Sequence, residues 1–244
     1  MGERKAVLAL ADGTVFGGVS FGYEGECGGE VVFNTGMTGY QEVLTDPSYK
    51  GQIVTMTCPE IGNTGINPED VESNRPWVEG FIVRESWGPP SSWRHVESLD
   101  AYLRRYHVCG IAGIDTRALT RRLRDGGSQM GVISALGRDP EELVREARGL
   151  PPIVGRDLVR EVTTDHVHRW ETGDWDLEKG YLHASEYRAR FDRVPRIVAV
   201  DYGIKQNILR MLVASGFSVT VVPADTAAEA ILARNPDGVF LSNG

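Results

Sequence analysis

The 244-residue sequence contains little cysteine and no long hydrophobic run. Its three cysteines, Cys27, Cys58 and Cys109, are odd in number and widely spaced, which predicts neither a disulfide framework nor a zinc site. No apolar stretch approaches the roughly 20 residues of a membrane span, and the first residues do not form a cleavable signal. We therefore expect a cytoplasmic protein with no membrane partner.

Positive charge is also scarce. The sequence has 26 Lys and Arg against 34 Asp and Glu, a net charge of −8, whereas a sequence-independent nucleic-acid binder needs a basic surface. It contains neither a G-x-x-x-x-G-K-[ST] loop nor a G-x-G-x-x-G turn, the two familiar cradles for nucleotide phosphates. We expect no nucleic-acid partner and no cofactor on this chain, so that any ATP in a complete enzyme would bind elsewhere.

The pattern of residues 1–150 predicts a β-rich domain. Residues 5–21 are typical of a hairpin with its turn at Ala11-Asp12-Gly13. Further strands are expected at 30–34, 52–57, 78–84, 110–114 and 130–136, and helices at 99–106, 116–124 and 140–148. Another short helix should begin with a capping box formed by Thr38 and Gln41 and end before Pro47. The excess of strands indicates an α+β domain packed in layers.

The pattern weakens over residues 151–195, which we interpret as a covering segment and linker, and then becomes regular. Strands at 196–201, 218–222 and 238–241 alternate with helices at 204–215 and 226–234. This alternation predicts right-handed βαβ units around a parallel, flavodoxin-like sheet. Three strands are fewer than the five or so of a typical sheet, so we expect residues 196–244 to be a truncated α/β domain. In such sheets ligands bind beyond the carboxyl ends of the strands, where Ser242-Asn243-Gly244 falls.

Several reactive residues have an ordinary explanation. The segment 18–22 matches the serine-hydrolase motif G-x-S-x-G around Ser20, but a turn-like stretch follows instead of the required helix, which indicates coincidence. His166 and His168 lack further ligands nearby and are better explained as surface residues than as a metal site. None of the cysteines has a helix start or a cation beside it in sequence, so buried, unreactive thiols are expected.

Two further segments, a basic stretch after Asp115 and a turn at residues 45–49, have no assigned function from their residues alone. Four arginines follow Asp115 on an expected helix: Arg117, Arg121, Arg122 and Arg124. They could form a solvated helix face or an ion-paired contact surface for a partner protein. Residues 45–49, TDPSY, are typical turn residues and by themselves indicate only a structural turn.

Taken together, five blocks resemble the small, glutamine-hydrolysing subunit of carbamoyl phosphate synthetase. The most specific is residues 29–67, in which GEVVFNTGMTGYQE is followed by TDPSY. The other blocks are IAGIDTRALTRRLRDGG (111–127), DLVREVTT (157–164), VAVDYGIKQNILRMLVASG (198–216) and PDGVFLSNG (236–244). They occur in the order of the family and extend over most of the chain.

This resemblance implies an N-terminal domain that contacts a large synthetase subunit, followed by a class I glutamine amidotransferase domain. In such enzymes a cysteine thiolate attacks L-glutamine, a histidine oriented by a glutamate transfers protons, and backbone N–H groups bind the oxyanion. The ammonia would pass through a tunnel to the large subunit. That subunit would use ATP, Mg²⁺ and bicarbonate to make carbamoyl phosphate for arginine and pyrimidine biosynthesis.

Two residues carry over by motif as glutamine-binding positions. Ser48 matches the serine that helps hold the substrate, and Gly244 matches the first glycine of an SNGPGDP loop whose main chain approaches it. The family's nucleophile lies in a G-[IV]-C-L-G-H-Q elbow that these 244 residues do not contain, nor do they contain its His and Glu partners. We therefore expect no catalytic residue in this chain and no activity from it alone. In an alternative interpretation, residues 1–150 serve only as a non-enzymatic docking module for a synthetase partner.

Overall fold

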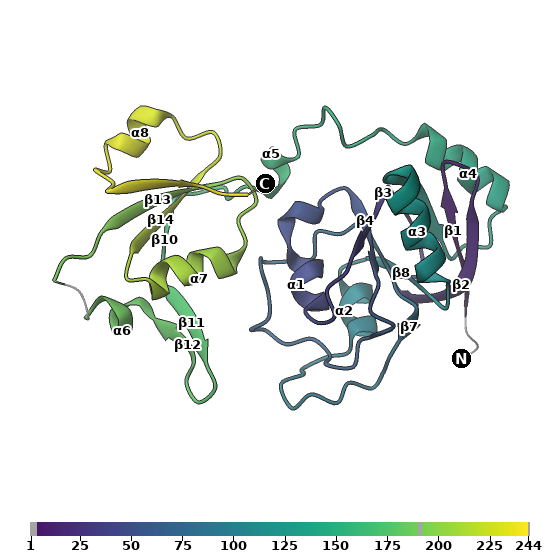
Figure 1. Cartoon of the computed structure of the whole chain (residues 1–244), viewed down its shortest axis with the longest axis horizontal. Coiled ribbons are helices and arrows are strands. Elements are labelled where there is room, and N and C mark those ends of the chain that lie inside the picture. The colour runs from purple at the N-terminus through teal and green to yellow at the C-terminus, as the bar shows by residue number, and fades with distance from the viewer. Residues whose placement is uncertain (1–3, 190–191, 244) are drawn as a thin grey trace. The chain divides into compact units, whose positions relative to one another are not determined.

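The computed structural model describes residues 4–189 and 192–243, and the chain forms two compact units. The first unit is Met1–Arg156 and the second unit is Asp157–Gly244 (Figure 1). The boundary lies after Arg156, and residues 157–195, expected as part of a covering segment and linker, contribute elements to the second unit. Helices and strands occur in both units, and this confirms the α/β class.

Seven strands of the first unit form a closed barrel. In order around the barrel they are β1 (Lys5–Leu10), β2 (Val15–Gly22), β8 (Cys109–Ala112), β6 (Gly80–Ile82), β4 (Gln52–Met56), β3 (Glu26–Asn34) and β9 (Gln129–Ser134). Three neighbouring pairs are parallel: β3 with β4, β4 with β6, and β6 with β8. The other four neighbouring pairs of the barrel are antiparallel. Pairing of β9 with β1 closes the ring and removes the free edges that open layers would expose.

The barrel is filled by one apolar cluster, and a second cluster packs outside it. Six strands each contribute a fully or almost fully buried side chain to the first cluster: Leu8, Val31, Ile53, Ile82, Ile111 and Ile133. Side chains from six strands can meet in one cluster only in the barrel interior. The second cluster includes Leu44, Phe81 and Leu103 and joins the outer face of the sheet to two helices.

The helices of the first unit begin largely where their capping residues predict. They are α1 (Tyr40–Thr45), the 3₁₀ turn η1 (Pro47–Tyr49), α2 (Leu99–Arg105), α3 (Thr116–Gly126) and α4 (Pro140–Gly149), and a two-stranded ladder of β5 (Glu60–Ile61) and β7 (Glu85–Ser86) completes the unit. Asp139 caps α4 by accepting the N–H of Glu141 at 2.7 Å, with Pro140 in the first turn, as expected.

The expected capping box of α1 is wrong. Gly39, with a φ of 79°, precedes the helix, and no side chain caps it. The left-handed conformation suits a glycine and leaves the Thr38 side chain out of the cap position. Gln41 instead uses its amide on a distant loop, where it donates to the Asn67 carbonyl and accepts the Asn67 N–H.

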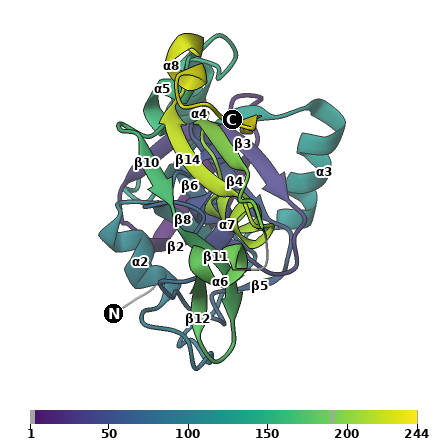
Figure 2. The same ribbon diagram turned by 90° about the vertical axis from the view of Figure 1, so that its left-hand side faces the viewer.

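The second unit is built around a four-stranded sheet in the order β10-β14-β13-β15. Its elements are α5 (Val159–Val162), β10 (His168–Trp170), β11 (Thr172–Asp176), β12 (Gly180–His183), α6 (Ala184–Arg188), β13 (Arg196–Asp201), α7 (Gln206–Ala214), β14 (Ser218–Pro223), α8 (Ala228–Leu232) and β15 (Gly238–Leu241). The strands β14, β13 and β15 are parallel, as the alternation predicts, and β10 runs antiparallel beside β14 (Figure 2).

Helices lie on both faces of this sheet (Figure 1). On one face Leu209 and Val213 of α7 pack with Ala199, Val219 and Val221 of the strands. On the other face Ile231 of α8 packs with Val198, Val200 and Val222. Because α8 has only five residues, it covers less of its face than α7 does.

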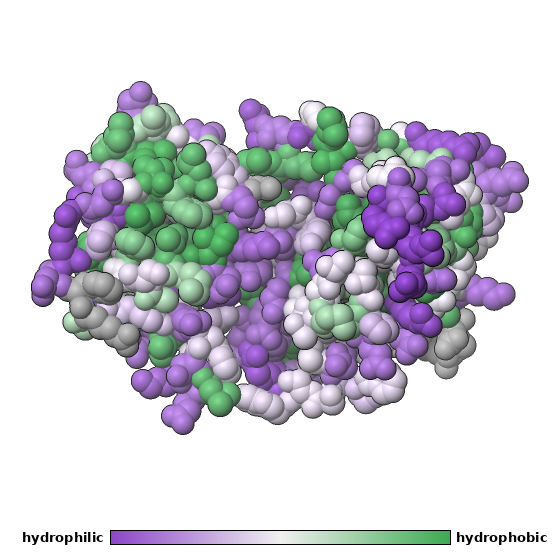
Figure 3. All heavy atoms as spheres, viewed as in Figure 1, coloured by the Kyte–Doolittle hydropathy of each residue, from purple (hydrophilic) through white to green (hydrophobic). Residues whose placement is uncertain are grey.

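Part of the second unit's surface is apolar. Leu232 of α8 and Val239 and Leu241 of the outer strand β15 are exposed. Figure 3 shows hydrophobic surface in this region, over β15 and α8. Within residues 4–189 and 192–243, no helix has the length and apolar character needed to cross a membrane.

Candidate functional site

The TDPSY segment forms a tight turn that leaves Ser48 exposed. The Asp46 carboxylate accepts the backbone N–H of Ser48 at 3.0 Å and caps η1, whose first residue is Pro47. Asp46 and Pro47 are buried, whereas Ser48 is exposed. The hydroxyl of Tyr49 accepts a hydrogen bond from Asn34 Nδ2 at 2.9 Å. The turn therefore holds an exposed serine above a base of buried groups.

Thr45 anchors the start of this turn. Its side chain is completely buried, and its Oγ1 donates to the carbonyl of Gln41 at 2.8 Å and accepts the N–H of Glu72 at 2.9 Å. Ser73 Oγ donates to the Thr45 carbonyl and also accepts Trp77 Nε1 at 2.9 Å. Loop residues about thirty positions away therefore fix the backbone of the turn.

Two residues of the neighbouring TGYQE segment, Tyr40 and Gln41, also form hydrogen bonds to a distant loop. Tyr40 is buried, and its hydroxyl donates to the carbonyl of Gly65 at 2.7 Å and accepts Thr64 Oγ1 at 2.9 Å. Burial raises the pKa of the Tyr40 phenol, so it remains a neutral donor at ordinary pH. Together with the amide of Gln41, it fastens α1 to the loop over residues 61–67.

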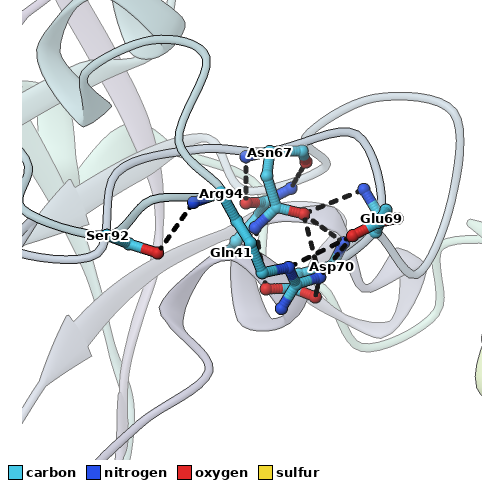
Figure 4. A network of polar contacts seen from close by, with 6 residues as sticks. All are labelled: Gln41, Asn67, Glu69, Asp70, Ser92 and Arg94. Carbon is cyan, nitrogen blue, oxygen red and sulfur yellow. Dashed lines mark hydrogen bonds and ion pairs between the residues drawn. The ribbon is translucent and has the colours of Figure 1, made fainter. Parts of the chain in front are cut away.

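A half-buried ionic network extends that loop, and sequence reasoning did not identify it (Figure 4). Arg94 Nη2 lies 2.9 Å from Glu69 Oε2 and 2.6 Å from Asp70 Oδ1. Asn67 Oδ1 accepts the backbone N–H groups of Glu69 and Asp70, both at 2.9 Å. The arginine comes from a segment about 25 residues further along the chain, and no local motif marks the pairing. The network stabilises the loop that in turn holds α1 and Ser48.

In the second unit, Asp201 organises the carboxyl end of β13. This aspartate is 6% exposed, and its Oδ1 accepts the N–H groups of Gly203 at 2.8 Å and Ile204 at 2.7 Å. Its Oδ2 accepts the N–H of Thr164 at 2.7 Å, while the Thr163 hydroxyl donates to its carbonyl at 2.6 Å. The similarity of residues 157–164 and 198–216 to the family thus corresponds to one hydrogen-bonded cluster at the ligand-binding end of a parallel sheet.

Ser242 belongs to the same end of the sheet. Its Oγ accepts the N–H of Tyr202 at 2.9 Å, and its N–H donates to the Val200 carbonyl at 3.2 Å. The strand β15 therefore delivers its last residues beside the turn after β13. Gly244, the second glutamine-binding position expected from sequence, lies outside the described residues.

The three cysteines occupy positions unsuited to nucleophilic catalysis. Cys27 is on β3, Cys109 is on β8, and Cys58 follows β4, where its thiol lies 3.6 Å from the Glu60 carbonyl. All three are free thiols, and none starts a helix. The adjacent Cys109 thiol and burial raise the pKa of Cys27 well above its usual value. A raised pKa disfavours the thiolate that catalysis requires.

The other reactive candidates are also in ordinary settings. Ser20 lies within β2, paired with Ile111, and the chain continues into β3 without the helix that a nucleophile elbow requires. His166 is exposed, and its ring interacts with its neighbours Asp165 and His168. In the part of the chain that the structure describes, no group of three or more His, Cys, Asp or Glu side chains could hold a metal ion.

The basic helix α3 combines paired and unpaired arginines. Arg122 forms an ion pair with Asp12, and Arg124 pairs with Asp125 at 2.8 Å. Arg117 and Arg121 are exposed and make no ion pair within the described residues. Figure 3 shows a strongly hydrophilic surface over this helix. Both interpretations of the arginines, a solvated face and a partner-contact surface, fit this arrangement.

Comparison with known proteins supplies the family. The model of the carbamoyl-phosphate synthase small chain, CPSase domain, matches residues 8–133, just over half of the chain. The chain belongs to this carbamoyl-phosphate synthase small chain family. The glutamine amidotransferase class-I model matches residues 198–244, which contain most of β13 and all of α7, β14, α8 and β15. The resemblance stated from sequence is confirmed, and so is the presence of an amidotransferase region.

Relatives within the carbamoyl-phosphate synthase small chain family match almost the whole chain. Carbamoyl phosphate synthase small chain from Syntrophotalea carbinolica is 60% identical over 240 residues, which are 98% of this chain and 62% of the relative. The small chain from Aquifex aeolicus is 52% identical over 99% of this chain and 64% of its own length. The small chain from Pseudomonas putida is 53% identical, with 99% and 63% covered. The chain thus spans less than two thirds of the length of these relatives.

Proposed function

We propose that this chain acts as part of the small subunit of a glutamine-dependent carbamoyl phosphate synthase. In this proposal the complete small subunit hydrolyses L-glutamine to glutamate and ammonia. The large subunit, with ATP and Mg²⁺, takes the ammonia through a tunnel and makes carbamoyl phosphate for arginine and pyrimidine biosynthesis. Membership of the family and two family matches along one chain support the proposal. Three cysteines that form no disulfide suit a reducing, cytoplasmic compartment.

The observation that carries the substrate assignment is the exposure of Ser48. The side chains of Thr45 and Asp46 are buried and form hydrogen bonds to the backbone of this unit, whereas Ser48 is presented to solvent. A hydroxyl can donate to the carboxylate of an amino acid or accept from its ammonium group. We assign Ser48 as a glutamine contact, with Gly244 as a second contact carried over from the family motif.

In our proposal, no residue of this chain acts as the catalytic nucleophile. The raised pKa of Cys27, the strand position of Cys109 and the buried position of Cys58 all argue against an attacking thiolate. Loss of even one member of a catalytic triad lowers the rate by several orders of magnitude. The purified chain should therefore release no ammonia from L-glutamine.

Two assays on the purified 244-residue chain test this proposal. Ammonia release from L-glutamine should stay at the level of the buffer control, and turnover like that of a complete amidotransferase would contradict the proposed absence of a nucleophile. Mixing with the large subunit of a relative should give a complex stable to gel filtration. A complex together with no glutamine contact at Ser48 would favour the docking-module interpretation. Without a complex, the assignment of the large subunit as partner would be wrong.

A further inference from the structure

The second unit contains a pocket at the end of the sheet opposite to Asp201. It has a volume of about 360 Å³ and is lined by the first residues of two parallel strands, Arg196 of β13 and Ser218 of β14. Arg169 of β10 and Arg234 and Pro236, which follow α8, also line it. The volume falls within the range typical of small-molecule sites.

Strand register explains why these residues meet. Thr220 pairs with Val198 on one side and with Arg169 on the other, so the three form a row across β13, β14 and β10. Arg196 and Ser218 form a second row two residues earlier on β13 and β14. Directly paired residues point to the same face of a sheet. This is the face of Val198, where the five-residue helix α8 leaves part of the sheet open.

The pocket is positively charged. Across residues 4–189 and 192–243, neither Arg169 nor Arg234 has an ion pair. The third guanidinium, Arg196 Nε, lies 4.0 Å from Asp237 Oδ2, and that carboxylate is shared with Arg193. The hydroxyls of Ser218 and Thr220 make no hydrogen bond to any residue that the structure describes. Of the three guanidinium groups, only that of Arg196 thus has a neighbouring carboxylate within the described residues, and two hydroxyl donors lie beside them.

We propose that this pocket binds the phosphate group of a small phosphorylated metabolite. Arginine forks match phosphate oxygens bidentately, and hydroxyls can donate to the remaining oxygens. The site goes beyond the proposed glutamine chemistry and shares no residue with it. A nucleic-acid backbone fits less well, because the chain carries a net charge of −8 and the arginines converge on a pocket instead of forming an extended stripe.

Isothermal titration calorimetry of the full chain with pyrophosphate, at low ionic strength, tests the proposal. The unmodified chain should show saturable binding to one site. The double variant Arg169→Gln, Arg234→Gln should bind at least about tenfold more weakly, because it loses two charged donors. The matched control is Arg160→Gln, which changes an exposed arginine of α5 that pairs with Asp157 at 2.8 Å, away from the pocket. It should bind like the unmodified chain.

Thr220→Val provides a second variant that keeps all three arginines and the volume of the side chain. It should weaken pyrophosphate binding severalfold while urea unfolding shows an intact fold. The proposal is overturned by an absence of saturable heat, by equal loss in the Arg160 control, or by unchanged affinity in both pocket variants. Tighter binding of a short single-stranded oligonucleotide than of pyrophosphate would overturn the assignment to a small ligand. An L-glutamine titration should be the same in the double variant, which separates this test from that of the proposed function.

Discussion

Asp46 and Ser48 are linked by a 3.0 Å hydrogen bond from the backbone N–H of Ser48 to the buried Asp46 carboxylate. This bond closes the 3₁₀ turn and orients the only exposed side chain among residues 46–48. The buried aspartate thus fixes the turn, and the serine that follows it is exposed at the surface of the first unit.

Asp46→Ala should therefore destabilise the first unit and loosen the turn. Loss of a capping acceptor costs about 1 kcal/mol of unfolding free energy. Asp46→Asn keeps an acceptor oxygen and should lose less. Urea unfolding gives the stability, and amide hydrogen exchange at Ser48 reports the turn. If both variants match the unmodified chain in stability and in exchange at Ser48, this role of Asp46 is wrong.

Glu42 gives the first unit a pH-dependent stability. Burial raises the pKa of this carboxyl above its ordinary value of 4.5, with Asp70 and Glu72 raising it further and Arg94 opposing them. A raised folded-state pKa contributes stability that is fully present below the unfolded pKa and is lost as the pH rises through the folded pKa. At pH 7 the charged form therefore destabilises the fold.

Glu42→Gln should be more stable than the unmodified chain at pH 7, and the difference should shrink as the pH falls through the raised folded-state pKa and be gone below about 4.5. Urea unfolding midpoints across this pH range measure the effect. The exposed Glu141, in the first turn of α4, provides a control in which Gln should bring no gain at pH 7. A Glu42→Gln variant that is less stable at pH 7 would contradict the burial argument.

Asp201→Asn should destabilise the second unit by about 2 kcal/mol, because hydrogen bonds to a buried charged acceptor are stronger than neutral ones. The asparagine amide cannot accept the N–H groups of Gly203, Ile204 and Thr164 with both of its terminal atoms. Urea unfolding followed by amide exchange at Gly203 measures the loss. Asp157→Asn, at an exposed position, is the control and should change little. Unchanged protection at Gly203 would show that Asp201 does not hold this turn.

Local signals in the sequence predicted much of the fold. Short, mainly apolar segments located the strands β1, β4 and β15, and Asp139 with Pro140 located the start of α4. These features depend on residues close together in sequence, so a pattern can show them.

Features that depend on distant partners were not predictable in this way. Closure of the barrel needs β1 to pair with β9, more than 100 residues later, which no local pattern indicates. The Thr38 and Gln41 pattern matched a capping box, but the Gln41 side-chain amide forms hydrogen bonds with the backbone of Asn67 instead. The strand β10 has only three residues, none of them buried, and it is defined by its pairing with β14.

In the candidate site, too, local motifs were predictable and contacts between distant residues were not. The motif predicted Ser48, and the structure adds why it is exposed. The support from Arg94 and the anion pocket around Arg169 come from residues that only folding brings together.

Titration of the isotope-labelled 244-residue chain with L-glutamine, followed by NMR, tests the substrate assignment most directly. D-glutamine serves as the control ligand, and Ser48→Ala as the control variant. Our account predicts saturable shifts of the Ser48 amide with the L-isomer and weaker overall binding by the variant. A folded chain whose Ser48 amide does not respond to L-glutamine, or whose binding is the same after Ser48→Ala, would contradict it.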